Sequence, residues 1–350
     1  MDAKVLPFKN SPVIGLLGHA YVLGILSNYE ECLPWFYNNY IQLYFSRRYL
    51  EERGEFWLDF FPDLMVIFED VPWLEYHRMD KETIFNNNID LNKFIIDYIN
   101  RGYYFFTCAD EFFIPGKVAY NRLHFTHDIM VYGYNLEKKT YNIAGFGTHY
   151  MYKASEVSFE EFNLAFNNAV SKKNLISLLK KVEDFNKYKY DFRIGKYDFD
   201  IKLVVEMLSD YLYSRNSTER LGIYRNPDDD FFGMKIYEYL KMYLERLLDN
   251  KVRFDIKPIH ILWEHKKCML LRIKYMREKG FLNSSSVAYE GYMKIEKEVL
   301  MLRNAILKYQ LSGSKDIIEK IIPSIRDIAA EENRVLEDLI NEIRKTNSLH

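Results

Sequence analysis

Two residues of this sequence carry side chains that could together attack a carbonyl group. Cys32 lies at or just before the start of an expected helix, because Pro34 follows where a first helical turn accepts proline. His127 opens the apolar strand "HDIMVYGYN", 95 residues further along the chain. A thiol with a distant histidine is a candidate nucleophile–base pair.

Each of the two residues also has a purely structural interpretation. The positive end of a helix favours a Cys32 thiolate, whereas the carboxylates of Glu30 and Glu31 oppose it, and a lone cysteine is often a small buried hydrophobe. A histidine beside an apolar strand often donates to a backbone carbonyl. The pair His124-x-x-His127 lacks a third ligand at a diagnostic spacing, so we predict no metal site.

The order of the motifs adds to the case for chemistry. A cysteine at a helix start, a later histidine at a strand start and a Gly-Tyr turn after it form the arrangement of papain-like and bacteriocin-leader-type cysteine peptidases. The sequence further resembles the butirosin-biosynthesis protein H family, which are papain-like acyltransferases of antibiotic and nonribosomal peptide assembly. The resemblance is carried by "ADEFFIPG" (109–116), "RLHFTHDIMVYGYN" (122–135), "YNIAGF" (141–146), "SFEEF" (158–162) and "LWEHKKCMLLRI" (262–273).

This resemblance implies a reaction and its partners. An acyl group would arrive as a phosphopantetheine thioester on an acyl or peptidyl carrier protein, with no cofactor bound by the enzyme itself. The Cys32 thiolate would attack the thioester and give an acyl-enzyme. His127 would first take the thiol proton and later help to deprotonate an amine, which is a small molecule or a carrier-bound acceptor. The thioester supplies the driving force, so no ATP is needed.

The third catalytic residue departs from the pattern of papain-like enzymes. Those enzymes orient the histidine with an Asn or Asp from the strand after the Gly-Tyr turn, where this chain has Gly145. Asn142 is the nearest polar residue, but strand alternation puts it on the opposite face from position 145. Asp110 ends the strand before the histidine strand, and we favour it over Asn142. A Cys–His dyad without an acid is the third alternative.

The oxyanion hole departs from the pattern as well. Papain-like enzymes use the backbone N–H of the nucleophile and a Gln six residues earlier, and that position here is Leu26. The backbone N–H of Cys32 and the side chain of Asn28 are the candidates. Loss of one such donor typically costs about 3 kcal/mol in the barrier, so a catalytic protein needs a substitute.

A basic region is the candidate docking surface for an acidic carrier protein. Its alternative interpretation is an ordinary solvated face. The residues predicted to bind the carrier are Lys172, Lys173, Lys180 and Lys181, and Lys187, Lys189, Arg193 and Lys196 extend the cluster.

The chain as a whole is predicted to be an α+β protein in two parts. Residues 1–155 are expected to form a papain-like catalytic domain, and residues 156–350 a mostly α-helical domain. We expect a helix over 89–102, a strand over 103–116, an antiparallel pair over 128–135 and 140–147, and a capping box at Ser158 and Glu161. The apolar run near the N-terminus is interpreted as a buried strand or turn.

Composition narrows the setting of the protein. The chain has 350 residues, 48% of them hydrophobic, and a formal net charge of -2, so no general attraction to nucleic acid is expected. Its three cysteines are far apart, which fits a reducing cytoplasm. No apolar run reaches the length that spans a membrane.

Two rival functions use the same residues. A cysteine peptidase or thioesterase would keep Cys32 and His127 and accept water in place of an amine. A non-catalytic descendant would bind a peptide or a carrier protein, which Leu26 and Gly145 favour.

Overall fold

The computed structural model of the protein describes residues 2–61, 68, 71–170, 175–183, 197–220 and 230–349. The chain divides into two compact units, each built from two chain segments. Unit 1 comprises residues 1–32 and 65–196, and unit 2 comprises residues 33–64 and 197–350. The predicted boundary after residue 155 therefore differs from the observed one. The reason is that strands far apart in the sequence pair with one another inside each unit.

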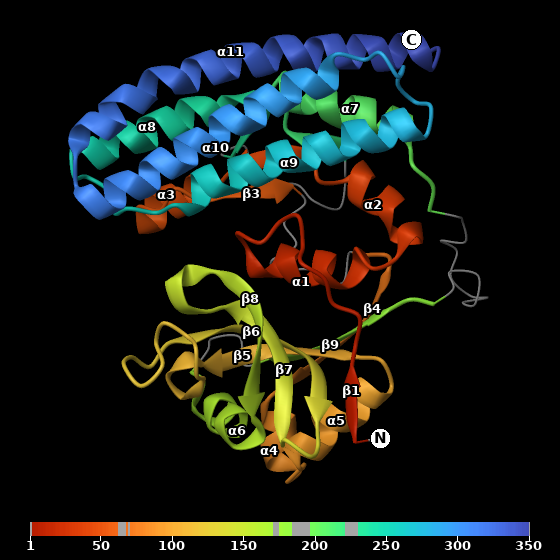
Figure 1. Cartoon of the computed structure of the whole chain (residues 1–350), viewed down its shortest axis with the longest axis vertical. Helices are drawn as coiled ribbons and strands as arrows, with labels where there is room; N and C mark the ends of the chain where they lie inside the picture. The colour runs from red at the N-terminus through yellow and green to blue at the C-terminus, as the bar shows by residue number, and fades with distance from the viewer. Residues whose placement is uncertain are drawn as a thin grey trace. The chain divides into compact units, whose positions relative to one another are not determined.

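Unit 1 is built on a sheet whose described strands number seven, in the order β4-β9-β5-β6-β7-β8, with β1 paired to β6. All these pairs are antiparallel. Figure 1 shows the sheet with its short helices. The strands are β1 (Ala3–Val5), β4 (Leu74–Asp80), β5 (Tyr104–Asp110), β6 (Thr126–Asn135), β7 (Thr140–Phe146), β8 (Tyr152–Ser158) and β9 (Leu175–Lys181).

Helices pack on both faces of this sheet. Phe105 of β5 contacts Phe94 of α5 (Leu91–Asn100) and Phe162 of α6 (Phe159–Asn168). Phe106, which points to the opposite face, contacts Tyr21 of α1 (Leu17–Leu26). The other helical segments described in this unit are α4 (Glu82–Asn86) and the 3₁₀ helices η1 (Glu30–Cys32), η3 (Glu111–Phe113) and η4 (Thr148–Tyr150).

Helix α1 corrects the interpretation of the N-terminal apolar run as a strand or turn. All ten of its residues are buried, so no polar face interrupts the run and no helical period is visible in the sequence. A continuous apolar stretch of this length is compatible with either a strand or a helix. Further along, the helix expected to start near Pro34 is the short α2 (Leu33–Asn38), and β2 (Gln42–Phe45) follows it.

Other predicted elements of unit 1 are confirmed. The β6–β7 pair forms antiparallel, α5 lies within 89–102, and β5 lies within 103–116. The capping box at the start of α6 is complete: the Ser158 side chain accepts from the Glu161 N–H, and the Glu161 carboxylate accepts from the Ser158 N–H. The segment "PDLMVIFEDV" (62–71), whose apolar run predicts a further strand, lies almost entirely outside the described residues.

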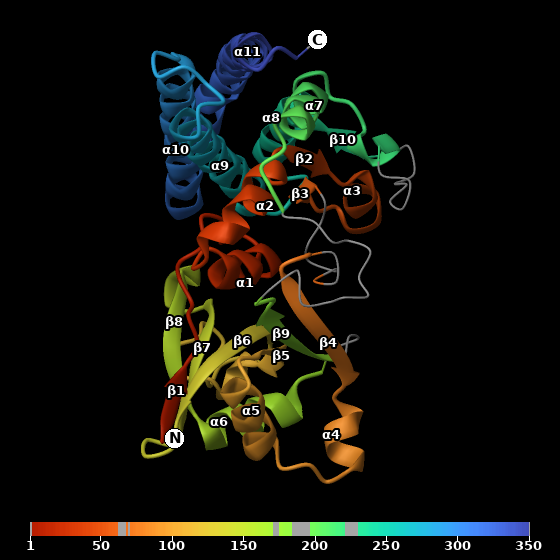
Figure 2. The ribbon, with the colours of Figure 1, turned by 90° about the vertical axis from the view of Figure 1, so that its right-hand side faces the viewer.

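Unit 2 combines a small sheet with long helices. Its described strands pair in the order β10-β2-β3, and Figure 2 shows β2 and β10 beside α7 and α8. Helix α9 packs on α10, α10 on α11, and α11 on α8. Besides α2 and β2, the elements are α3 (Arg47–Arg53), β3 (Leu58–Phe61), α7 (Ile201–Leu212), η6 (Ser217–Arg220), β10 (Phe231–Phe232), η7 (Gly233–Lys235), α8 (Ile236–Leu248), α9 (Lys257–Glu278), α10 (Ala288–Ser312) and α11 (Lys315–Thr346).

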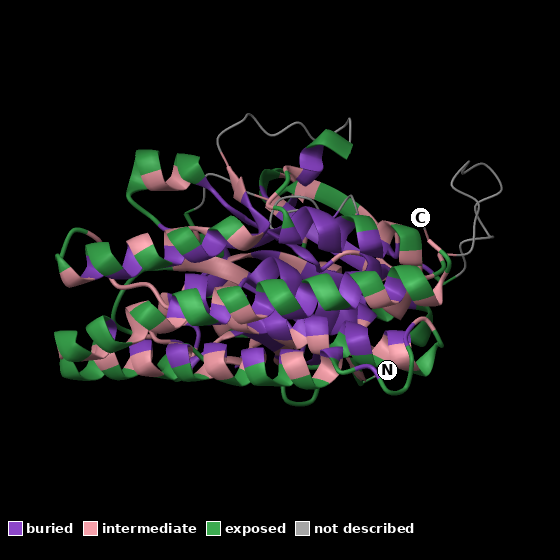
Figure 3. Ribbon diagram, turned by 90° about the horizontal axis from the view of Figure 1, so that it is seen from above, coloured by how far each residue is buried: buried purple, intermediate pink, exposed green. Residues whose placement is uncertain are grey.

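The long helices of unit 2 are amphipathic, as predicted from their periodicity. Figure 3 shows buried and exposed residues alternating along them. On α11 the buried positions include Ile318, Ile325, Ile328, Leu336 and Leu339, which recur at intervals close to the helical period. The chain is therefore a mixed α and β protein with antiparallel sheets and C-terminal helices, as expected at this level. Among the described residues, no helix is both long and apolar enough to cross a membrane.

A buried ion pair lies at the centre of the unit 2 helices. The Lys266 ammonium lies 2.6 Å and 2.7 Å from the two carboxylate oxygens of Glu332, and both side chains are fully buried. The hydroxyls of Tyr211, Tyr237 and Tyr292 donate to the same carboxylate. Because burial alone lowers the pKa of Lys266, the ammonium depends on Glu332 to remain charged.

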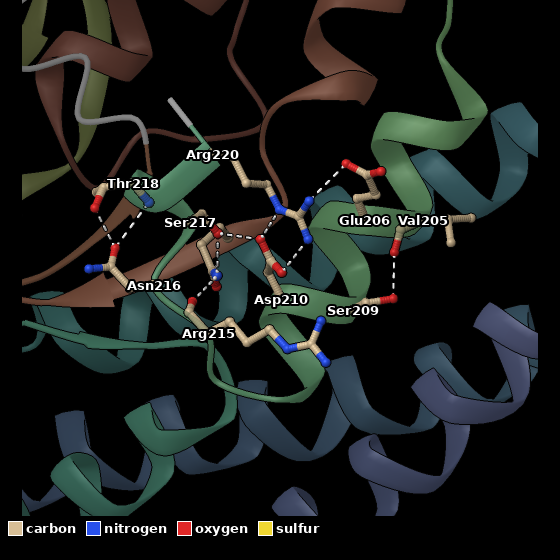
Figure 4. A network of polar contacts seen from close by, with 10 residues as sticks. Val205, Glu206, Ser209, Asp210, Arg215, Asn216, Ser217, Thr218 and Arg220 are labelled. Carbon is tan, nitrogen blue, oxygen red and sulfur yellow. Dashed lines mark hydrogen bonds and ion pairs between the residues drawn. The ribbon is translucent and has the colours of Figure 1, made fainter. Parts of the chain in front are cut away.

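A second polar network joins α7 to the segment that follows it (Figure 4). The buried Asp210 carboxylate accepts two hydrogen bonds from the Arg220 guanidinium, at 2.7 Å and 2.9 Å, and a third from Ser217. Gln42 of β2 donates to the Ser217 hydroxyl. Each carboxylate oxygen of Asp210 accepts at least one hydrogen bond, and the network links β2 to α7.

Candidate active site in unit 1

His127, near the start of β6, contacts a buried carboxylate. Its Nδ1 lies 3.2 Å from Oε1 of Glu111, whose side chain is 9% exposed, while the His127 side chain is 31% exposed. Nε2 of His127 has no hydrogen-bond partner among the residues that the structure describes. One ring nitrogen is therefore held by the protein, and the ring is partly exposed to solvent.

Lys117 completes a buried cluster with Glu111. Its Nζ lies 3.7 Å from the same Oε1 atom and donates a hydrogen bond of 2.7 Å to the carbonyl of Phe146. Burial lowers the pKa of Lys117, and the Glu111 carboxylate opposes that shift. We call Lys117, Glu111 and His127 the charged triad, after the Lys117–Glu111 ion pair, with His127 as the member in contact with the same carboxylate.

Gly145 leaves the space in which the Lys117 ammonium lies. A Cβ atom at position 145 would come within 2.8 Å of Lys117 Nζ, closer than side-chain contacts allow. Lys117, from another element, thus occupies the space beside Gly145. The family resemblance implies an orienting acid at that position. The acid at the histidine comes from η3 instead of β7.

Asp110, the favoured third catalytic residue, does not contact His127. Its carboxylate lies 2.6 Å from Nδ1 of His124 and accepts hydrogen bonds from the backbone N–H groups of Phe112 and Phe125. These bonds fix the turn after β5. The predicted pairing of Asp110 with His127 is therefore wrong, and the carboxylate beside His127 belongs to the next residue, Glu111.

Asn142 does not contact His127 either. It pairs with Gly133 in the β6–β7 ladder, and its side-chain oxygen lies next to that glycine. His127 lies six residues before Gly133 on β6, which separates the two by roughly 20 Å along the strand at ~3.3 Å per residue.

Helix α1 crosses β6 and β7 beside the charged triad. The Tyr21 hydroxyl lies 3.1 Å from the carbonyl oxygen of Asp128 and 3.2 Å from that of Ala144. Burial, with nearby Tyr152, Asp128 and Glu111, raises the pKa of Tyr21 well above its usual value. The first turn of α1 reads "LGHA" and contains no thiol or hydroxyl group. The helix that meets the histidine strand therefore brings no nucleophile to its start.

Cys32 lies at the junction of η1 and α2, as predicted, but its thiol is not activated there. The residue is 2% exposed, and burial raises its pKa to about 12, against a lowering effect of Lys181. Lys181 is itself bonded to Glu31 at 2.5 Å, and Glu31 acts in the opposite direction on the Cys32 pKa. The thiol is thus in its protonated form at neutral pH.

The structure places Cys32 and His127 at opposite ends of the sheet. In the ladders of β5, Tyr104 pairs with Leu179 and Ala109 pairs with His127, so Lys181 is level with position 102. The seven positions from 102 to 109 correspond to roughly 23 Å at ~3.3 Å per residue. Cys32 lies at the end of the sheet marked by Lys181, because its neighbour Glu31 is bonded to Lys181. The predicted nucleophile–base contact is therefore not formed.

The predicted oxyanion donors are engaged elsewhere. The backbone N–H of Cys32 donates to the carbonyl of Tyr29 at 3.1 Å. The side-chain amide of Asn28 donates to the carbonyls of Gly24 and Ile25, at 2.8 Å and 2.9 Å, and so caps the end of α1.

The predicted carrier-docking lysines are only partly described. Lys172 and Lys173 lie outside the described residues, as do Lys187, Lys189, Arg193 and Lys196. Lys180 lies over the ring of Tyr103 at 5.4 Å, and Lys181 is bonded to Glu31. Carrier binding by this region stays a prediction.

Comparisons with known proteins do not assign the site. No protein-family model matches the chain, and no curated protein is significantly similar to it. Within the described part of the chain, no group of three His, Cys, Asp or Glu side chains is arranged to hold a metal ion. The reaction proposed for this site therefore rests on the residues of the charged triad.

Sequence reasoning missed two members of the charged triad. Glu111 directly follows Asp110, and the 3₁₀ turn that begins there changes the direction of successive side chains, so strand alternation does not extend past Asp110. Lys117 lies in an irregular loop, where no period predicts a direction. The one available signal was the pair of adjacent acids at the end of a strand that was expected to lie beside the histidine strand.

Proposed function

We propose that unit 1 transfers an acyl group from a thioester to an amine, with His127 as the general base and without an acyl-enzyme intermediate. The observation that carries this proposal is the contact of His127 Nδ1 with the buried Glu111 carboxylate, beside a partly exposed ring. An ionised Glu111 accepts from Nδ1–H and so keeps Nε2 as the proton acceptor.

The proposed step is a single displacement at the thioester carbonyl. The amine nitrogen attacks the carbonyl carbon, and Nε2 of His127 takes one N–H proton. The C–S bond then breaks, and the departing thiolate recovers that proton from the imidazolium. The products are one amide and one thiol, so protons and electrons balance without ATP or a redox partner. General-base assistance of this kind typically contributes about 10²–10⁴-fold.

The family resemblance supports the choice of donor. It implies a phosphopantetheine thioester on an acyl or peptidyl carrier protein, and a papain-like arrangement of helix and histidine strand. The packing of α1 on β6 and β7 beside His127 supports that arrangement. The direct route differs from the one the resemblance implies, because the first turn of α1 has no thiol and Cys32 lies away from His127.

Glu111 and Lys117 act as positioning residues in this proposal. When His127 takes a proton, the resulting imidazolium lies 3.2 Å from the largely buried Glu111 carboxylate. Lys117, 3.7 Å from the same carboxylate oxygen and bonded to the carbonyl of Phe146, helps to hold the Glu111 carboxylate in place. The charged triad thus prepares the site for the charge that develops on His127.

The test is amide formation from a pantetheine thioester and an amine, followed by mass spectrometry of the products. His127→Ala is expected to lower the rate by about 10²–10⁴-fold. The matched control is His77→Ala, since His77 is an exposed histidine on β4 that does not contact the charged triad.

Three outcomes would contradict the proposal. Equal rates in the wild type and His127→Ala would show that His127 is not the general base. Free acid as the product, with no amide at high amine concentration, would indicate a thioesterase. Binding of the thioester without any turnover, across a panel of amines, would indicate a protein that only binds its ligand.

A further inference from the structure

Large apolar side chains are exposed in the two chain segments next to His127 and Phe146, whose rings contact each other. We define the apolar rim as Leu123 and Phe125, which precede His127, together with Tyr150 and Met151, which follow β7. Their exposed fractions are 63%, 46%, 75% and 59%. Exposed apolar residues that gather in one place mark interaction sites more often than isolated ones do.

The apolar rim is continuous with the imidazole of His127. The centre of the Phe125 ring lies 5.3 Å from the centre of the His127 ring. The Phe146 ring stacks on His127 with a centroid distance of 6.1 Å and an interplanar angle of 15°. Phe146 ends β7 and leads into the loop that carries Tyr150 and Met151. An apolar group at the rim would therefore begin next to the proposed base.

Backbone contacts hold the two loops of the rim together. The N–H of Thr148 donates to the carbonyl of Gly116 at 2.9 Å, which joins the loop after β7 to the loop before β6. The N–H of Gly147 donates to the carbonyl of Met151 at 2.9 Å. Tyr150 and Met151 are thus presented by a closed, hydrogen-bonded turn.

That turn also has an unfavourable backbone conformation. His149 and Tyr150 both adopt positive φ angles, of 60° and 54°. Non-glycine residues rarely occupy this region, and such residues gather at ligand-binding and catalytic sites. The same turn presents the Tyr150 side chain at 75% exposure.

We propose that the apolar rim binds the acyl chain of the donor and that the preferred donor is a thioester of an apolar acyl group. This inference rests on the proposed function, since it takes the reacting carbonyl to lie at His127. The chain attached to that carbonyl must extend from the imidazole, where the rim begins. The amine acceptor and the pantetheine arm are polar, so the acyl chain is the part of the substrates that matches the rim.

The experiment measures binding without turnover. Isothermal titration calorimetry is performed with ketone analogues of acyl-pantetheine, in which a methylene replaces the sulfur, with acyl chains of about two to eight carbons. We expect affinity to rise by about twofold for each methylene, and at least ~10-fold over the series, because a half-open surface buries roughly half of each group.

The decisive variant removes three apolar side chains of the rim and keeps Phe125 beside His127. It is the triple substitution Leu123→Ser, Tyr150→Asn and Met151→Ser, with Asn chosen because it tolerates a positive φ. The matched control is Met301→Ser with Leu311→Ser, two exposed apolar residues on α10. Circular dichroism and the melting temperature check that both variants fold.

The dependence of affinity on chain length should disappear in the rim variant and persist in the control. An affinity that does not rise with chain length in the wild type would overturn the inference, as would an unchanged dependence in a folded rim variant. The result is independent of catalysis. If affinity depends on chain length but the protein forms no amide, binding of the acyl chain by the apolar rim is supported and only the proposed reaction is contradicted.

Discussion

Nδ1 of His127 lies 3.2 Å from Oε1 of Glu111, and Nζ of Lys117 approaches the same oxygen to 3.7 Å. This relationship gives the histidine an orienting carboxylate from the turn after β5. Strand β7, which the family resemblance implies as the source of that acid, instead provides the small residue Gly145 and the carbonyl of Phe146 that Lys117 contacts. The histidine is therefore supported from a different direction.

The first prediction separates Glu111 from its neighbour Asp110. Glu111→Gln removes the negative charge beside the imidazole, so we expect kcat to fall by roughly 10²-fold or more with little change in KM. Asp110→Asn is the matched control, because Asp110 contacts His124 and not His127. The two variants are compared by steady-state kinetics over a range of pH. A larger loss in Asp110→Asn than in Glu111→Gln would contradict the assignment of the orienting acid.

The second prediction concerns the space at Gly145. Gly145→Ala places a methyl group 2.8 Å from Lys117 Nζ, and overpacking of this kind typically costs about 1–3 kcal/mol. Lys117→Ala removes the ammonium, so adding Gly145→Ala to it should cost much less than in the wild type. Urea unfolding of both single variants and the double variant measures this coupling. Additive effects would show that Lys117 does not determine the need for glycine.

The third prediction concerns the reactivity of Cys32. Its pKa is raised to about 12, so at pH 8 almost none of it is thiolate, and the fraction rises only as the pH approaches 12. Iodoacetamide at pH 8 should therefore leave Cys32 unmodified in the folded protein, while the partly exposed Cys108 reacts first. Peptide mapping by mass spectrometry reads out both sites. Rapid labelling of Cys32 would indicate an activated thiol.

The fourth prediction tests the buried ion pair of unit 2. Glu332→Gln keeps the shape of the side chain but leaves the Lys266 ammonium buried without its counter-ion, which typically costs about 3–5 kcal/mol. The neighbouring Glu331 makes exposed ion pairs with Lys294 and Arg334, so Glu331→Gln should change stability by no more than about 0.5 kcal/mol. Chemical denaturation compares the two. Equal losses would mean that burial does not decide the effect.

The elements that sequence predicted well are those whose pattern is local. The β6–β7 pair, α5 and the Ser158–Glu161 capping box each depend on residues within a short stretch, so their period and turn residues are sufficient. Helix α1 was missed because every residue in it is buried, which removes the polar face that would show a helical period.

The division into units could not be read from local patterns. Strand β9 lies between β4 and β5 in the sheet, although some 95 residues separate it from β4 along the chain. Residues 33–64 likewise join helices that begin after residue 197. Such pairings depend on complementary surfaces and not on spacing in the sequence.

The candidate site was half predicted for the same reason. His127 was identified from the strand that follows it, and this position is set by local pattern. Its partner Glu111 depends on where a 3₁₀ turn begins, and Lys117 depends on the path of a loop. Cys32 was placed correctly at a helix start, but the ladders of β5 put it at the other end of the sheet from His127.

The most direct test of the central claim is the mass of the intact protein during amide formation, measured together with the rates of Cys32→Ala and His127→Ala. Direct transfer predicts that no acyl group is attached to the protein at any time. It also predicts that Cys32→Ala keeps its activity, and that His127→Ala loses about 10²–10⁴-fold. An acyl adduct on Cys32, with amide formation abolished in Cys32→Ala, would contradict the claim and restore the covalent route.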